Sequence, residues 1–325
     1  MCCCLACVLC VSVSLYGRSA EKQTDVPFRL IWNYLVVVRG SIGGQANLNF
    51  IVDTGANPSI LDKRLADRLH LSGPNEKLPV LNGSVNITRV SAPAVEVGPV
   101  VRDTMEMAVQ DLSFLERDLG VRIDALIGLD VLGKRNFRID YESKRIHFDG
   151  RPSGAGTASF TSGPPFVTVE MKMENQPVRL LVDTGAAGLI LFSGRLPDHL
   201  RILKESPATN GANSTGSFKM REVEIGNARL GNMDLGSRRA FVAADQGADN
   251  DFDGLLGISP LAVRELAFDF EHGLLTWQSR ERSPRPNPDF YCNGKESSSA
   301  NPAGPEATLR PPGACQEVHP LPLKF

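Results

Sequence analysis

An internal repeat constrains the fold of this chain more than any other feature of its sequence. The string FIVDTGA at residues 50–56 recurs as LLVDTGA at 180–186, and DALIGLDVL at 124–132 recurs as DGLLGISPL at 253–261. The two blocks keep the same order, at offsets of 130 and 129 residues. We therefore expect two copies of one structural unit, each of about 120 residues.

Each copy is predicted to consist mostly of β-strands. Alternating apolar residues, typical of a half-buried strand, occur at Val36, Val38, Gly40 and Ile42 in the first copy and at Val167, Val169, Met171 and Met173 in the second. In each copy a turn, Gly43-Gly44 or Glu174-Asn175, leads to a second strand that ends in Asp-Thr-Gly. Helical patterns are confined to residues 62–71 and to the short stretches that follow Gly128 and Pro260.

A third repeated block, 81–98 against 209–226, ends in VEVG and VEIG and carries an Asn-Gly dipeptide in both copies. This dipeptide favours a tight hairpin turn. We therefore expect hairpins at Asn82-Gly83 and Asn210-Gly211, although a longer loop that uses Gly216 fits the second copy as well.

Charge and cysteine content exclude several classes of protein. The net charge of −2 offers no basic field to attract a nucleic acid, so no nucleic-acid partner is expected. Five of the seven cysteines lie in the first ten residues, and only Cys292 and Cys315 lie elsewhere. A zinc site or disulfide framework in the body of the protein is therefore excluded, and no metal is expected. Cys292 and Cys315 are compatible with one disulfide or with two free thiols.

The two ends of the chain differ in composition from the repeats. The stretch from Cys2 to Leu15 is apolar and uncharged, as in the central region of a signal peptide, but no basic residue precedes it. We expect an exported protein, periplasmic, secreted or in the cell envelope, with residues 1–20 as its signal peptide. A cytoplasmic location stays open, as does acylation of the clustered cysteines. No other stretch is apolar enough to predict a membrane span. Residues 281–325 are rich in proline and read as a flexible tail.

Two Asp-Thr-Gly motifs, each followed 75 or 74 residues later by two apolar residues and a glycine, resemble the aspartic peptidases. Alanine after the glycine, and ALIGLDVL followed by FRIDYESKRIHF, are closer to the retropepsin-like branch. The resemblance covers roughly residues 27–280 and implies a mostly β, bilobal aspartic-peptidase fold with two homologous β-barrel lobes and few short helices. We expect lobes at 27–150 and 162–280, joined by a flexible linker at 151–161.

The resemblance also implies an activity, that of an aspartic endopeptidase acting on a peptide or protein. Asp53 and Asp183 would face each other across an internal pseudo-two-fold axis and hold a water molecule. One carboxylate would accept a proton from this water as general base, while the other, protonated, would donate to the substrate carbonyl. No cofactor is implied. Because one chain carries both half-sites, we expect a monomer.

The same resemblance assigns supporting roles to the neighbours of the two aspartates, which are Thr54, Gly55, Ala56, Thr184, Gly185, Ala186, Gly128 and Gly257. The motif glycines are expected to bring an N–H to each aspartate where a side chain would obstruct. The two threonines are expected to hydrogen-bond across the interface. Gly128 and Gly257 correspond to the family position at which a strand of the same lobe passes beneath the Asp-Thr-Gly loop.

Two departures from the family pattern, one further interpretation and one alternative function accompany this hypothesis. The flap segments 81–98 and 209–226 lack both the tyrosine of pepsin-like enzymes and the glycine-rich tip of viral ones. The residues after the motifs differ, Asn57-Pro58 against Ala187-Gly188, so the cleft need not be symmetric. Asp130 is interpreted as a helix N-terminal carboxylate, and Ser259 in its place in the second copy argues against an essential role. The alternative function is a peptide-binding module that has kept the cleft but does not cut.

Overall fold

The structure is a computed structural model that describes residues 24–80, 83–150, 154–163, 166–197, 200, 202–213, 216–244 and 251–280. The predicted signal peptide, the proline-rich tail and both C-terminal cysteines lie outside the described residues. Within the described residues, no helix combines the length and apolar character that a membrane crossing requires.

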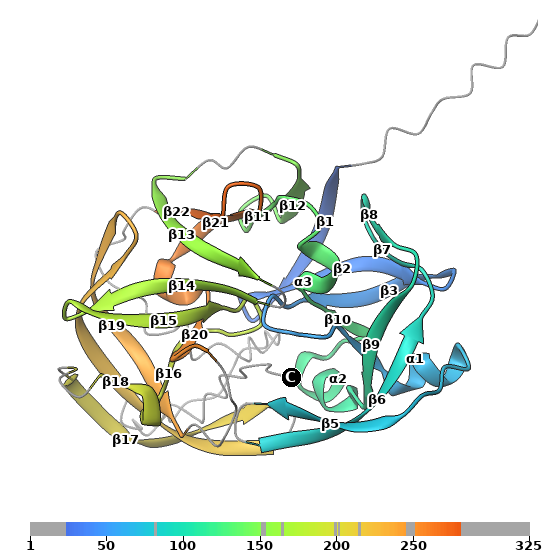
Figure 1. Cartoon of the computed structure of the whole chain (residues 1–325), viewed down its shortest axis with the longest axis horizontal. Helices are drawn as coiled ribbons and strands as arrows, with labels where there is room; N and C mark the ends of the chain where they lie inside the picture. Colours follow the sequence, from blue (N-terminus) through green and yellow to red (C-terminus); the bar gives the residue numbers. More distant parts are fainter. Residues whose placement is uncertain are drawn as a thin grey trace, which may run out of the picture.

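The chain forms two β-rich lobes that lie side by side (Figure 1), as the repeat predicted. The N-terminal lobe contains β1 (Asp25–Ile31), β2 (Leu35–Ile42), β3 (Gln45–Val52), β4 (Ile60–Asp62), β5 (Asn75–Val80), β6 (Gly83–Ala92), β7 (Val95–Val97), β8 (Val100–Arg102), β9 (Met105–Gln110), β10 (Ala125–Ile127), β11 (Phe137–Asp140) and β12 (Arg145–Phe148). The C-terminal lobe contains β13 (Gly156–Gly163), β14 (Phe166–Met173), β15 (Gln176–Val182), β16 (Leu189–Phe192), β17 (Ile202–Asn213), β18 (Gly216–Leu230), β19 (Met233–Ala243), β20 (Gly254–Leu256), β21 (Val263–Asp269) and β22 (Leu274–Ser279).

Both lobes use the same strand arrangement around the repeated motif. In the N-terminal lobe β10 lies between β3 and β4, parallel to β3 and antiparallel to β4. In the C-terminal lobe β20 lies between β15 and β16 in the same way. The Asp-Thr-Gly loops connect β3 to β4 and β15 to β16. Each loop therefore leaves a buried strand beside the strand that carries the second repeated block.

A shared antiparallel sheet joins the two lobes. Among the described strands its order is β1, β12, β11, β21, β22 and β13. At its centre Arg138 pairs with Ala267, and these residues lie 129 positions apart, the same offset as in the second repeated block. Phe137 pairs with Phe268, and Ile139 with Leu266, on either side of this position. A pseudo-two-fold axis therefore passes through the centre of the β11–β21 pair.

Strand β13 corrects the predicted linker at 151–161 and the predicted start of the second lobe at residue 162. It pairs with β22 and then with β14, just as β1 pairs with β12 and then with β2. The small residues here serve packing rather than flexibility. A Cβ at Gly156 would lie 2.2 Å from the ring of Trp277, and one at Gly154 would lie 2.6 Å from the Trp277 carbonyl oxygen. Glycine in a strand often marks such a close approach.

Two long hairpins, β5–β6 and β17–β18, extend from the two lobes toward each other on the side opposite β11 and β21 (Figure 1). In the first, Val80 and Gly83 form the last strand pair, so Asn82 falls in the two-residue connection, outside the described residues. The tight turn predicted at Asn210-Gly211 is wrong, because both residues lie within β17 and pair with β18. Gly216 instead closes the hairpin by pairing with Asn213, so the connection has two residues rather than the longer loop of the alternative.

The helices are short, and their positions match the prediction only in part. The pattern at 62–71 forms α1 (Lys63–Arg68), and the stretch after Gly128 forms α3 (Leu129–Leu132). The stretch after Pro260 is not a helix; a single 3-10 turn, η2 (Ser259–Leu261), leads through left-handed Ala262 into β21. The helix α2 (Ser113–Leu119) was not predicted, although left-handed Gly120 is a typical helix terminator.

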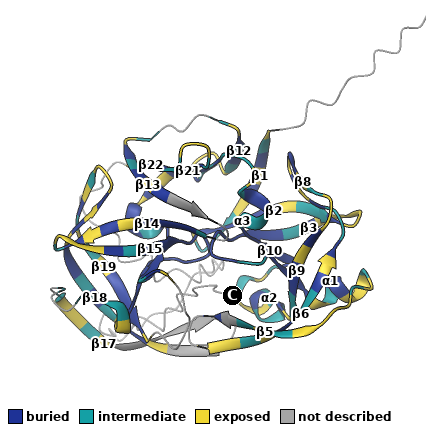
Figure 2. Cartoon of the chain, in the orientation of Figure 1, coloured by how far each residue is buried: buried dark blue, intermediate teal, exposed yellow. Residues whose placement is uncertain are grey.

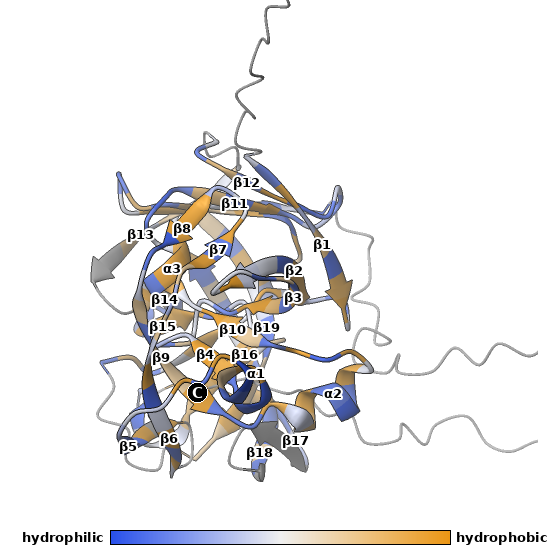
Figure 3. Cartoon of the chain, turned by 90° about the vertical axis from the view of Figure 1, so that its right-hand side faces the viewer, coloured by the Kyte–Doolittle hydropathy of each residue, from blue (hydrophilic) through white to orange (hydrophobic). Residues whose placement is uncertain are grey.

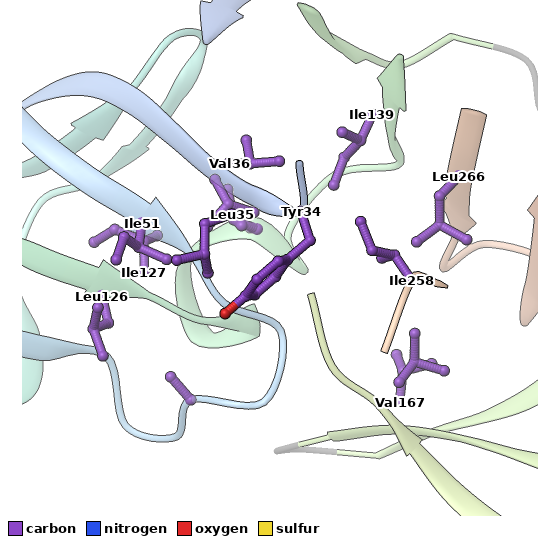
Figure 4. Close-up of a cluster of buried hydrophobic side chains, with 14 of the residues drawn as sticks. Tyr34, Leu35, Val36, Ile51, Leu126, Ile127, Ile139, Val167, Ile258 and Leu266 are labelled. Atoms are coloured by element: carbon purple, nitrogen blue, oxygen red, sulfur yellow. The ribbon is translucent and has the colours of Figure 1, made fainter. Parts of the chain in front are cut away.

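The main hydrophobic core runs through both lobes without interruption. It includes Leu35, Ile51 and Ile127 of the N-terminal lobe together with Val167, Ile258 and Leu266 of the C-terminal lobe (Figure 4). The strands on which the lobes meet are buried, whereas exposed residues gather on the outer hairpins and loops (Figure 2). In the side view, α1 presents hydrophilic residues on the outside (Figure 3). A continuous core of this kind holds the two Asp-Thr-Gly loops in a defined relative position.

Candidate active site

The structure brings Asp53 and Asp183 together at the interface between the lobes. Both side chains are fully buried. The N–H of Asp53 donates to the carbonyl of Ile127 at 2.9 Å, and the N–H of Asp183 donates to that of Leu256 at 3.0 Å. Each aspartate is therefore positioned by the strand that lies beside it in its own lobe, β10 or β20.

Each carboxylate accepts a hydrogen bond from the glycine of its own motif. The N–H of Gly55 lies 2.9 Å from Asp53 Oδ1, and the N–H of Gly185 lies 2.8 Å from Asp183 Oδ1. Ala56 and Ala186, which follow them, are buried, and their N–H groups donate to the carbonyls of Asp53 and Asp183. These bonds close a tight turn in each loop.

The motif glycines also leave room for the aspartate of the opposite lobe. A Cβ at Gly55 would lie 2.7 Å from Asp183 Cγ, and a Cβ at Gly185 would lie 2.8 Å from Asp53 Cγ. Neither glycine has a positive φ. The requirement for glycine is therefore a matter of space rather than of backbone conformation.

The threonines form the cross-lobe hydrogen bonds that the sequence led us to expect. The N–H of Thr54 donates to Thr184 Oγ1 at 3.1 Å, and the N–H of Thr184 donates to Thr54 Oγ1 at 3.0 Å. The hydroxyl of Thr54 donates to the carbonyl of Val182 at 2.7 Å, and that of Thr184 to the carbonyl of Val52 at 2.9 Å. These four buried bonds join the two loops, so neither aspartate can move without the other.

Gly128 and Gly257 lie directly beneath the two loops. A Cβ at Gly128 would lie 2.0 Å from the carbonyl oxygen of Ala56, and one at Gly257 would lie 2.3 Å from that of Ala186. Any side chain at either position would push the active loop away from its supporting strand. The close backbone approach expected from the sequence is therefore present in both lobes.

The surroundings of Asp53 favour its protonated form. Burial raises the pKa of Asp53 well above its usual value, and the charge and side-chain hydrogen bond of Asp183 raise it further. The N–H groups of Gly55 and Ala56 act in the opposite direction. Two carboxyl groups held this close share a single proton, because ionising both would place two like charges side by side in a buried site.

The two Asp-Thr-Gly loops are supported differently at one place. In the N-terminal lobe Asp130 takes part in this support, a role beyond that of the helix N-terminal carboxylate predicted from the sequence. Ser59 donates to Asp130 through its N–H at 2.7 Å and through its hydroxyl at 2.5 Å. The N–H of Gly128 in turn donates to Ser59 Oγ at 2.9 Å. In the C-terminal lobe Gly257 donates instead to the main-chain carbonyl of Gly188 at 3.0 Å. Ser59 was not singled out, since Leu189 occupies the repeat-equivalent position.

Tyr34 is a second residue that the sequence analysis missed. It is buried between side chains of the two lobes (Figure 4). Burial raises the pKa of its phenol, and the negative charges of Asp183 and Asp53 raise it further, so its hydroxyl stays protonated. By the register of β2 and β14, its counterpart in the second copy is Pro165. A search for repeated chemistry therefore could not find it.

One group of acidic and histidine side chains lies close together elsewhere in the described part of the chain. Atoms of Asp269, Glu271 and His272 lie within 4.8 Å of one another. Asp269 already accepts hydrogen bonds from Asn136 Nδ2 at 3.0 Å and from the His272 N–H at 3.1 Å. Glu271 and His272 are exposed, and the group lies in the turn between β21 and β22. These contacts explain why the three side chains lie together: they close the β21–β22 hairpin.

Comparison with known proteins gives the same two-part division of the chain. The model of a family described as Aspartyl protease matches twice, over residues 38–131 and 169–259. Each match contains one Asp-Thr-Gly motif and the apolar-Gly block that follows it. No curated protein matches the chain.

Proposed function

Because the chain belongs to the aspartyl protease family, we propose that it is an active aspartic endopeptidase that uses Asp53 and Asp183 as its catalytic pair. The observation that carries this proposal is the geometry of the dyad. Two fully buried carboxyl groups lie against each other, each bound by the N–H of its own motif glycine.

In the proposed reaction, a water molecule binds between the two carboxyl groups. The ionised carboxylate accepts a proton from this water, which attacks the carbonyl carbon of the peptide bond, while the protonated carboxyl donates to the carbonyl oxygen. The carboxyl group that took the proton from water then donates it to the nitrogen, and the C–N bond breaks. The hydroxyl formed from the carbonyl oxygen returns its proton to the other carboxylate, which restores the dyad. The four threonine hydrogen bonds keep the two carboxyl groups in register throughout.

The alternative is a module that binds peptides without cutting them. Both Asp-Thr-Gly motifs are intact, and so are the glycines and threonines that hold them. Loss of selection for cleavage usually damages at least one such residue, so this pattern favours an active enzyme.

Incubation with a mixed peptide library, from acidic to neutral pH, tests the proposal. We expect cleavage within peptides that is blocked by a statine inhibitor, which mimics the tetrahedral intermediate. Peptides that bind and are returned intact at every pH would support the module instead.

The pH dependence of cleavage is expected to be bell-shaped and to lie on the acid side of neutrality. At low pH both carboxyl groups are protonated, so the general base is lost. At higher pH both carboxyl groups ionise, so the general acid is lost and the rate falls. The raised pKa of Asp53 moves this fall to higher pH. Measurement of kcat/KM against pH reports two values that belong to the pair. A single ascending limb near pH 7 would instead indicate a histidine base.

One chain is expected to form one complete active site. Both aspartates meet within a single polypeptide whose lobes share a sheet and a hydrophobic core. Specific activity should therefore stay constant on dilution, and a mixture of Asp53→Asn and Asp183→Asn chains should be inactive. Initial rates over a wide range of protein concentration check this. Activity that falls with dilution, or that returns in the mixture, would show that lobes of different chains pair.

A further inference from the structure

A pocket of about 410 Å³ lies in the N-terminal lobe, next to the residues that follow the loop of Asp53. Asn57 and Pro58, which directly follow the Asp-Thr-Gly-Ala loop, form one part of its wall. Leu78 and Arg89, from the hairpin β5–β6, form another. A peptide that lies across the dyad beneath this hairpin would therefore pass the pocket mouth, and one of its side chains could enter.

The remaining wall comes from three charged residues, Arg102, Glu106 and Asp130, together with Met105. Of the charged groups in the lining, two already have partners. Arg89 is held by both oxygens of Glu76, at 2.5 and 3.0 Å. The Asp130 carboxylate accepts the two hydrogen bonds from Ser59 described above. The exposed Glu106 lies where solvent screens its charge.

Arg102 is the lining cation without such a partner. Its side chain is half-buried, and its Nε is buried with no hydrogen-bond partner. Among the described residues no carboxylate comes within ion-pair distance of its guanidinium, although Asp130 is close enough for their charges to interact. A buried guanidinium donor without an acceptor is unfavourable and calls for an explanation. The terminal nitrogens of this half-buried guanidinium are not among its buried atoms, so a carboxylate brought by a ligand can pair with them and offset part of this cost.

We propose that this pocket is a substrate subsite for an acidic side chain, aspartate or glutamate, with the guanidinium of Arg102 as its ion-pair partner. The planar guanidinium matches a carboxylate with parallel hydrogen bonds, which a neutral amide can only partly reproduce. This inference rests on the proposed peptidase function and names a class of substrate for it.

The subsite is present in one lobe only. In the N-terminal lobe Arg102 pairs with Val95, and the equivalent pairing in the C-terminal lobe joins Ala228 to Gly236, beside the buried Leu235. The equivalent place in the second lobe therefore holds no arginine. Ala187-Gly188 likewise replaces Asn57-Pro58. The pseudo-two-fold axis relates each subsite on one side of the scissile bond to a subsite that the other lobe forms on the opposite side. Because only one lobe carries this arginine, the acidic preference should occur on one side of the scissile bond only.

A position-scanning peptide set tests the inference. Glutamate or glutamine is placed in turn at each position on both sides of the scissile bond, and kcat/KM is measured for each peptide. At one position, we expect the wild-type enzyme to prefer glutamate by about 10- to 100-fold, the usual strength of a charge-assisted hydrogen bond. Arg102→Gln should abolish this ratio, and Arg102→Lys should keep part of it. Arg117→Gln, an exposed arginine on α2 outside the pocket, should keep the full ratio.

Equal ratios in the wild type and in Arg102→Gln, or an acidic preference of the same size on both sides, would overturn the inference while leaving the peptidase proposal intact. Absence of any cleavage would instead contradict the peptidase proposal. The subsite is then still testable, because calorimetry on Asp53→Asn measures the binding of the same peptides without turnover. Tighter binding of the glutamate peptide that disappears in Asp53→Asn/Arg102→Gln supports the subsite, and equal binding refutes it.

Discussion

Replacing either aspartate of the dyad, by Asp53→Asn or by Asp183→Asn, should lower kcat by about 10³-fold or more, the upper part of the range for general acid–base catalysis. Asparagine keeps the shape of the side chain, and its carbonyl oxygen can still accept the N–H of Gly55 or Gly185. It can neither take a proton from water nor donate one to the substrate. Initial rates on a cleaved library peptide measure the loss.

Thermal unfolding separates this loss from a loss of structure. The dyad is fully buried, and burial disfavours the charged form of Asp53, so a neutral amide should not lower the unfolding temperature. Asp67→Asn is a matched control, because Asp67 is exposed on α1 and, within the described part of the chain, its ion pair is with Lys63 alone. It should leave both rate and stability unchanged. Near-normal cleavage by either dyad variant would show that the catalytic pair is misassigned.

The repeat made the dyad predictable from sequence, because every residue that must act in symmetric pairs occurs twice. Asp53 meets Asp183 and Thr54 meets Thr184 across the interface, while Gly128 and Gly257 occupy equivalent places beneath the loops of their own lobes. The bilobal β-fold followed from the same relation. Symmetry thus turns a weak three-residue motif into a strong signal.

Residues and strands without an equivalent of the same kind in the other copy could not be predicted in this way. Ser59 and Tyr34 each stand opposite an unrelated residue in the other copy, and their roles depend on contacts with distant parts of the chain. Strand β13 was hidden for a different reason. Its small polar residues resemble β1 only in the strands with which they pair. Glycine is needed at residue 156 because the ring of Trp277 leaves no room for a side chain, and Trp277 lies more than one hundred residues later in the sequence.

Gly55→Ala and Gly185→Ala should each lower kcat by about 10²-fold or more, although only a methyl group is added. The new Cβ at residue 55 would lie 2.7 Å from Asp183 Cγ and Oδ2, closer than atoms at van der Waals contact. Asp183 cannot move aside cheaply, because the N–H of Gly185 holds its carboxylate at 2.8 Å. The two carboxyl groups must therefore separate, and a displacement of about 1 Å in a reacting group can cost about 10²-fold in rate.

Gly194→Ala is the matched control for these variants. Gly194 lies in η1 (Ser193–Arg195) of the same lobe as Gly185, and a Cβ there would meet no atom within 4 Å. It has no positive φ, so alanine fits the backbone, and rate and stability should be unchanged. The double variant Gly55→Ala/Gly185→Ala should lose less than the product of the single losses, because both methyl groups separate the same pair. Normal kcat in Gly55→Ala would mean that the carboxyl groups lie too far apart to share a proton, and the acid–base assignment for Asp53 and Asp183 would then fall with it.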